Sequence, residues 1–81
     1  MPGCYLEIYM LVNGNKDRYR VIFRRENKYS IYDIENICMY DGDLSGANNF
    51  IKNWQSDSEE YALLMEEMGY DVSITNNWNI L

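Results

Sequence analysis

The side chains of this 81-residue chain that could take part in chemistry are mostly carboxylates, and they gather in its second half. Residues 41–81 hold one basic residue, Lys52, against eight Asp or Glu, a net charge of −7, whereas residues 1–40 carry a net charge of +1. Phosphates are contacted by Lys and Arg, so this distribution argues against nucleic acid binding by the second half. It favours a basic partner, because complementary potentials speed encounter.

No complete catalytic site accompanies these acids. The sequence contains no histidine, which excludes His-based triads, acid–base pairs and metal sites. Carboxylate pairs such as Asp41 and Asp43 are expected on the surface of a chain with little room for a cleft. Cys4 and Cys38 have no basic neighbour in sequence to activate a thiolate. We therefore expect a protein that is not an enzyme and that uses no cofactor.

The segment from Asp41 to Gly46 matches the start of a calcium loop, with oxygen ligands at the first, third and fifth positions and glycine at the sixth. The twelfth position, where a bidentate Glu is needed, is Lys52, and no helix is expected before Asp41. We therefore predict no calcium site. The sequence favours a polar turn followed by a helix that Asp43 or Ser45 caps.

The clearest helix signal runs from Ser56 to Tyr70, SDSEEYALLMEEMGY. Ser56 and Glu59 have the spacing of a capping box, and Gly69 is a natural C-terminal stop. One apolar stripe at helical spacing is expected to face the core: Tyr61, Leu64, Met65 and Met68.

The opposite face of this helix is acidic. At ~100° per residue, two rows of glutamates flank Leu63, which points away from the core stripe. Such a face is either a solvated surface with one stray leucine or a binding surface with an apolar anchor inside a polar rim. We predict that the partner-binding residues are Asp41, Asp43, Asp57, Glu59, Glu60, Leu63, Glu66 and Glu67.

A first helix is predicted over Leu44–Gln55, with its apolar residues on one face. Gly46 and three asparagines weaken its intrinsic propensity, so packing must hold it. Almost no loop separates it from Ser56, so the two helices are expected to meet at an angle.

Alternation of apolar and polar residues predicts the strands. Two runs should form an antiparallel hairpin around a turn at residues 13–17, and a third follows a second turn at residues 26–28. Residues 33–40 are either an extended run with a bulge, which we favour, or a short helical turn. The two hairpin strands are predicted at Tyr5–Val12 and Arg18–Arg25, the third strand at Tyr29–Ile34, and a last strand at Tyr70–Thr75.

These elements predict a single α+β domain over residues 1–81 in the order βββααβ. An antiparallel sheet of three to four strands would carry two consecutive helices on one face. The apolar ending with Trp78, Ile80 and Leu81 is expected to be tied down. The predicted core comprises Leu6, Ile8, Met10, Val21, Phe23, Phe50, Trp54, Leu64, Met65 and Met68.

Basic and aromatic residues alternate in the second strand, loosely like a base-stacking surface with phosphate anchors. This interleaving is ordinary strand alternation, and if Tyr19 and Phe23 face the core, these rings cannot stack on bases. We therefore expect no direct nucleic acid binding. Two cysteines are too few for a disulfide framework, and neither a signal peptide nor a membrane-length apolar run is evident. A cytoplasmic protein with free thiols is predicted, and a single bridge between Cys4 and Cys38 stays open as an alternative.

The segment from Asn49 to Ile74 resembles part of a known protein family. Its Phe50-Ile51 pair, Trp54, and acids ahead of Tyr61 make it similar to small, acidic, phage-encoded anti-CRISPR proteins. The nearest are the type II-A inhibitors that occupy the DNA-binding cleft of an RNA-guided nuclease. This chain differs from them in having no helix before its first strand and a strand after its second helix. The resemblance implies DNA mimicry in the host cytoplasm, with carboxylates in place of phosphates.

The spacing of the acids is compatible with mimicry. Glu59 and Glu66 lie ~10.5 Å apart along a helix axis, about three rises of one DNA strand. Two other functions use the same sequence features. The chain could be an immunity protein or antitoxin that neutralises a basic toxin, or a non-catalytic structural or adaptor domain that forms a homodimer through its sheet.

Overall fold

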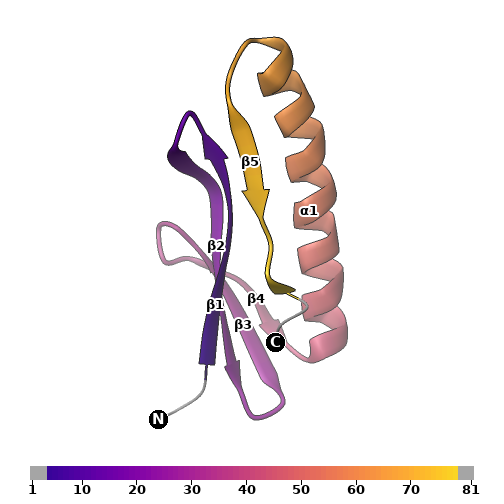
Figure 1. Cartoon of the computed structure of the whole chain (residues 1–81). Helices are drawn as coiled ribbons and strands as arrows, with labels where there is room; N and C mark the ends of the chain where they lie inside the picture. Colours follow the sequence, from indigo (N-terminus) through magenta and orange to yellow (C-terminus); the bar gives the residue numbers. More distant parts are fainter. Residues whose placement is uncertain (1–3, 79–81) are drawn as a thin grey trace.

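The structure is a computed structural model that describes residues 4–78, and it contains one antiparallel sheet and one helix (Figure 1). The sheet order is β4-β3-β2-β1-β5, and every neighbouring pair is antiparallel. The α+β class is confirmed, with five strands in place of three to four. The elements are β1 (Cys4–Val12), β2 (Asn15–Arg25), β3 (Lys28–Asp33), β4 (Cys38–Gly42), α1 (Leu44–Glu67) and β5 (Val72–Thr75).

The two predicted helices are one continuous helix of 24 residues, so the expected break between Gln55 and Ser56 is wrong. Two residues of α1, one turn apart, are held by a single residue of β2. The indole N–H of Trp54 donates to the Arg18 carbonyl at 2.7 Å, and Arg18 Nε donates to Ser58 Oγ at 2.8 Å. Ser58 is fully buried. Because these anchors lie on either side of the expected junction, the helix passes through it unbroken, and Ser56 caps nothing.

The two ends of α1 follow the predicted capping chemistry. Asp43 is the N-cap, and its carboxylate accepts the Gly46 N–H at 3.0 Å. At the other end Gly69 has a φ of +94°, which L side chains rarely adopt. The Tyr70 N–H then reaches back to the Met65 carbonyl at 3.0 Å, as in a Schellman motif. The predicted stop at Gly69 is therefore confirmed.

The predicted hairpin of β1 and β2 is confirmed, but its turn is only Asn13-Gly14, so β2 begins at Asn15. Both turn residues have positive φ, 51° and 84°, as in the tight turns that suit twisted strands. A bulge then interrupts the ladder between Ile8 and Met10. Arg18 lies in this bulge with a φ of 48°, and this conformation accompanies its contacts with α1.

The bulge decides which face of β2 enters the core. Met10 is paired with Asp17, but after the extra residue Leu6 is paired with Ile22. A shift of one residue moves every side chain of a strand to the other face. Val21 and Phe23 therefore lie on the face away from α1, and the prediction that they belong to the core is wrong.

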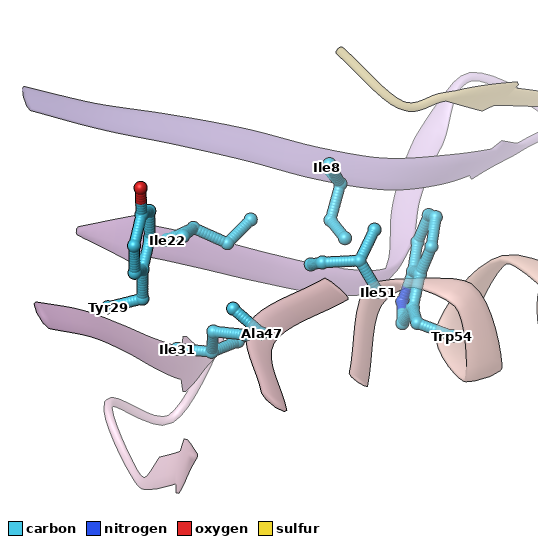
Figure 2. Packing of buried hydrophobic residues seen from close by; sticks show 7 residues of the cluster. All are labelled: Ile8, Ile22, Tyr29, Ile31, Ala47, Ile51 and Trp54. Atoms are coloured by element: carbon cyan, nitrogen blue, oxygen red, sulfur yellow. The ribbon is translucent and has the colours of Figure 1, made fainter. Parts of the chain in front are cut away.

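The core lies between α1 and one face of the sheet (Figures 1 and 2). Among the predicted core residues, Ile8, Met10 and Trp54 are buried, and Leu6 and Phe50 pack against the cluster in part. Figure 2 shows the side chains from strands and helix meeting in one layer. The cluster consists of Ile8, Ile22, Tyr29, Ile31, Ala47, Ile51 and Trp54.

The second half of α1 departs from the predicted core. Leu64 and Met68 are 60% and 69% exposed, so their assignment to the core is wrong, whereas Met65 is half-buried. The pairing of β2 with β3 ends at Arg20 and Asp33. From there toward the C-terminal end of α1, only the β1–β2 hairpin and β5 lie beside the helix (Figure 1). Too little sheet remains there to cover both sides of the predicted stripe.

Residues 33–40, expected as one extended run, are the end of β3, a turn and the start of β4. The Asp33 carboxylate accepts the N–H groups of Glu35 and Ile37 at 2.9 Å each, and Asn36 has a φ of 65°. A side chain that binds nearby backbone in this way competes with strand pairing. The result is an additional strand, β4, at the edge of the sheet.

Trp78 is tied down as predicted. Its ring meets that of Tyr29 edge-on at 5.8 Å, and its indole N–H donates to Asn48 Oδ1. Ile80 and Leu81 lie outside the described residues, as does the side chain of Cys4. Cys38 is an exposed free thiol.

Candidate functional site

The acidic surface predicted on the helix exists as an exposed surface, which we call the helix outer face. It consists of Asp57, Glu59, Glu60, Leu63, Glu66 and Glu67, all of them exposed. Leu63 is 64% exposed and lies nine positions after Trp54, which places it ~180° around the helix from that buried anchor. The contacts of Trp54 and Ser58 with Arg18 therefore turn this face to solvent.

The carboxylates of the helix outer face have no cationic partner within residues 4–78. The ion pairs of this part of the chain, Lys16–Glu7 and Lys28–Asp41, both belong to the sheet. The last turn of α1 contains no basic residue, so the partial negative charge of the helix C-terminus adds to that of Glu66 and Glu67. The result is a concentrated negative potential over the second half of α1.

Asp41 and Asp43 lie apart from this surface. Asp43 precedes Asp57 by fourteen residues, ~21 Å along the helix axis, and its carboxylate is engaged in capping. The Gly46 N–H and then the Tyr40 hydroxyl hold the pKa of Asp43 below its usual value. The pKa of Asp41 is lowered first by the Ser30 hydroxyl at 2.9 Å and then by Lys28. Asp43 therefore organises the turn into α1, and Asp41 binds side chains of β3 across the β3–β4 pair.

Sequence reasoning missed the apolar part of this surface. Leu64 and Met68 are exposed beside the acids, and Tyr70 is 39% exposed just beyond the helix end. At ~100° per residue, Glu60 and Glu67 lie between Leu63 and Leu64, so acidic and apolar rows alternate around the helix. The signal for Leu64 was present in the first half of α1, because continuing the stripe of Ala47, Ile51, Trp54 and Ser58 at the same spacing leads to Tyr61, Met65 and Met68 and leaves Leu64 outside it. Met68 is exposed because it is the C-cap of the helix.

A second exposed surface, which we call the open face, is the side of the sheet that α1 does not cover. On it the rings of Tyr5 and Phe23 lie 5.9 Å apart and those of Phe23 and Tyr32 5.8 Å apart, in one row across β1, β2 and β3. Tyr5 and Phe23 are 63% and 46% exposed. The expectation that β2 buries its aromatic residues hid this surface from sequence reasoning.

Two ion pairs lie on the open face. Lys16 Nζ lies 3.2 Å from Glu7 and within 5 Å of the ring centres of Tyr9 and Tyr19, at 4.9 and 4.8 Å. The Tyr19 hydroxyl donates to Glu7, which raises the pKa of Tyr19 to about 12 and, together with Lys16, lowers the pKa of Glu7. These contacts tie the polar groups of β1 and β2 to one another.

Arg18 and Arg20 do not share the open face with these rings. Arg18 reaches Ser58 on the helix side, and Arg20 occupies the same side of β2 as Ile22. Burial, and then the charge of Arg18, lower the pKa of Arg20. The aromatic row and these arginines therefore lie on opposite faces of the sheet, which is the reverse of what a surface for single-stranded nucleic acid needs.

Within residues 4–78, no helix has both the length and the apolar character needed to span a membrane. In the same part of the chain, no three Cys, Asp or Glu side chains lie together in a group that could hold a metal ion. Comparison with protein-family models, curated proteins and solved structures found no match to this chain.

Proposed function

We propose that this chain is a small non-catalytic inhibitor that holds a basic protein partner on the helix outer face. One observation carries the proposal. Five exposed carboxylates without an ion-pair partner in the described chain surround an exposed leucine, on a helix whose opposite side is anchored to the sheet. A rigid acidic surface with an apolar centre suits a partner that supplies Arg and Lys around a small apolar pocket.

The position of the acids supports a role in binding. The C-terminal end of a helix favours cations, yet this one carries Glu66 and Glu67 and no basic residue in its last turn. Like charges also repel across neighbouring turns. The local arrangement therefore costs stability, and arginine or lysine from a partner would offset that cost with charge-assisted hydrogen bonds.

We propose further that the partner surface is the nucleic-acid-binding surface of a CRISPR effector in the host cytoplasm, as the resemblance to anti-CRISPR proteins implies. The continuous helix supports this, because it holds Glu59 and Glu66 in one straight row and Glu60 and Glu67 in another. The ~10.5 Å between members of a row matches about three phosphate steps of a DNA strand.

The direct test is inhibition of target DNA cleavage by a purified type II-A RNA-guided nuclease, with binding measured on the same sample. Wild-type protein should inhibit cleavage, and binding should weaken as salt shortens the screening length from ~10 Å at 0.1 M to ~3 Å at 1 M. Reversing Glu59, Glu60, Glu66 and Glu67 to Lys should abolish binding and leave the circular dichroism spectrum unchanged.

A matched pair of double variants separates position from net charge. Glu60→Lys with Glu67→Lys changes the helix outer face, whereas Glu26→Lys with Glu35→Lys makes the same change in charge at exposed turn residues. We expect only the first pair to weaken binding. If the folded quadruple variant binds the nuclease as tightly as the wild-type protein does, the helix outer face is only a solvated surface. If the nuclease is not bound and affinity capture from host lysate retrieves a toxin, the immunity-protein alternative replaces the CRISPR one.

A further inference from the structure

We propose that the open face is the contact surface of a homodimer, in which a second copy of the chain packs its own open face against it. The two helix outer faces would then point outward on opposite sides of the pair. This arrangement differs from pairing through a sheet edge and requires no change in the strand order. It is independent of the partner proposed for the helix.

A row of aromatic side chains is exposed on the open face. Tyr5, Phe23 and Tyr32 touch one another across three strands, and Tyr5 and Phe23 leave about half of their surfaces in solvent, 63% and 46%. Met39 on β4 is also 45% exposed. Aromatic residues and methionine are enriched at protein interfaces, and contiguous exposed apolar patches mark interaction sites.

Charge also favours a second copy of the chain as the occupant of the open face. The chain carries a net charge of −6, so most of its surface would repel a second copy. On the open face, however, Glu7 is paired with Lys16 and Asp41 with Lys28, and exposed Arg25, which is paired with Lys28 across the β2–β3 ladder, leaves these five groups with a net charge of +1. A basic partner would gain no electrostatic attraction here, whereas a second copy meets a net charge of only one unit on this face instead of the strongly acidic surface elsewhere.

The area of the open face also suits a dimer interface. The five strands contain 9, 11, 6, 5 and 4 residues. At about 3.3 Å per residue and about 4.8 Å between strands, the sheet has a projected area of roughly 550 Å², and side-chain relief makes the accessible area larger. Specific interfaces bury about 600–1,000 Å² per partner. The open face is therefore of the right size for a small two-fold dimer, in which sheets pack about 10 Å apart.

Salt dependence separates this dimer from the proposed partner complex. Two copies of net charge −6 repel at long range, so salt should strengthen an association held by apolar contacts. Binding of a basic partner to the helix outer face should weaken over the same range. The two proposals therefore fail independently.

The experiment is sedimentation equilibrium of the purified chain at 0.1 M and 1 M NaCl. We expect a reversible dimer whose dissociation constant falls with salt. Phe23→Glu places like charges across the interface and should raise that constant by more than about 100-fold, since such juxtaposition costs several kcal/mol. Leu63→Glu, the matched control on the helix outer face, should leave the constant unchanged.

Circular dichroism checks that each variant is folded, and Tyr5→Glu replaces Phe23→Glu if the latter unfolds. A wild-type chain that stays monomeric at several hundred micromolar in 1 M NaCl overturns the proposal. So does a dimer that survives both open-face variants, or one that only Leu63→Glu disrupts. Saturable binding of a fluorescent single-stranded oligonucleotide, abolished by Phe23→Glu, would assign the open face to nucleic acid instead.

Discussion

The two halves of α1 form one continuous helix, but the first packs against the sheet and the second is exposed to solvent. The first half, up to Ser58, supplies every buried residue of the helix: Ala47, Ile51, Trp54 and Ser58. The second half buries none, and it exposes four glutamates together with Leu63 and Leu64. One half attaches the helix to the sheet, and the other displays side chains to solvent.

This difference shows that packing, rather than local propensity, decides where the helix is stable. Short isolated helices are marginal in water, and an amphipathic face supplies most of their stability in a protein. The acidic half forms as an extension of the anchored half and is closed by the cap at Gly69. Stability measurements should therefore separate the two halves sharply.

The largest contrast is expected between two alanine substitutions. Ile51→Ala removes a side chain that is 2% exposed and should lower the free energy of unfolding by about 2–5 kcal/mol, a large share of the margin of a small domain. Leu64→Ala removes a side chain that is 60% exposed and should cost less than about 1 kcal/mol.

Urea denaturation followed by circular dichroism measures both values. The sequence alone placed Leu64 in the core and predicted the larger cost for it. A loss above 2 kcal/mol for Leu64→Ala would restore that expectation and remove the distinction between the halves.

A medium effect is expected where the halves meet. Ser58→Ala deletes the acceptor of the Arg18 Nε–H, a hydrogen bond to a charged group at a buried site, and should cost about 1–3 kcal/mol. Ser56→Ala is the control, two positions away and exposed, and should change stability by less than about 0.5 kcal/mol. If the control cost more than Ser58→Ala, Ser56 would be acting as the helix cap that the capping-box pattern predicted.

The smallest effect has the opposite sign. Glu67→Lys puts a cation at the end of α1, where the last turn has no basic residue, and should raise stability by about 0.3–1 kcal/mol at low salt. The gain should disappear at 1 M NaCl in the same denaturation assay, because exposed charges are screened. A gain that persists at high salt would point to packing by the lysine stem and not to the helix dipole.

Local patterns sufficed to predict several elements from the sequence. Alternation placed Leu6, Ile8 and Met10 on the buried side of β1, and capping chemistry placed both ends of the helical region correctly. The exposure of Leu63 and its neighbouring glutamates followed from helical spacing alone. Each of these predictions depends on residues that lie close together in the sequence.

The remaining features depend on contacts between distant residues. The bulge at Arg18 exchanges the two faces of β2, and no local pattern in Arg18–Arg25 distinguishes one face from the other. The same residue anchors Trp54 and Ser58 and thereby joins two predicted helices into one. The helix sequence places Leu64 outside the buried stripe, but it cannot reveal that β3 and β4 are short and leave little sheet beside this end of α1.

The pairing of β5 with β1 has a consequence for synthesis on the ribosome. Val12 is paired with Val72, so the first strand meets the last only after the 59 residues between them have been made. The pairs β1–β2, β2–β3 and β3–β4 can form in order of emergence, but the outer edge of β1 at residues 9–12 stays unsatisfied until the end. A nascent chain stalled before Val72 would therefore present a free strand edge beside Met10, and a chaperone or a neighbouring nascent chain could pair with it.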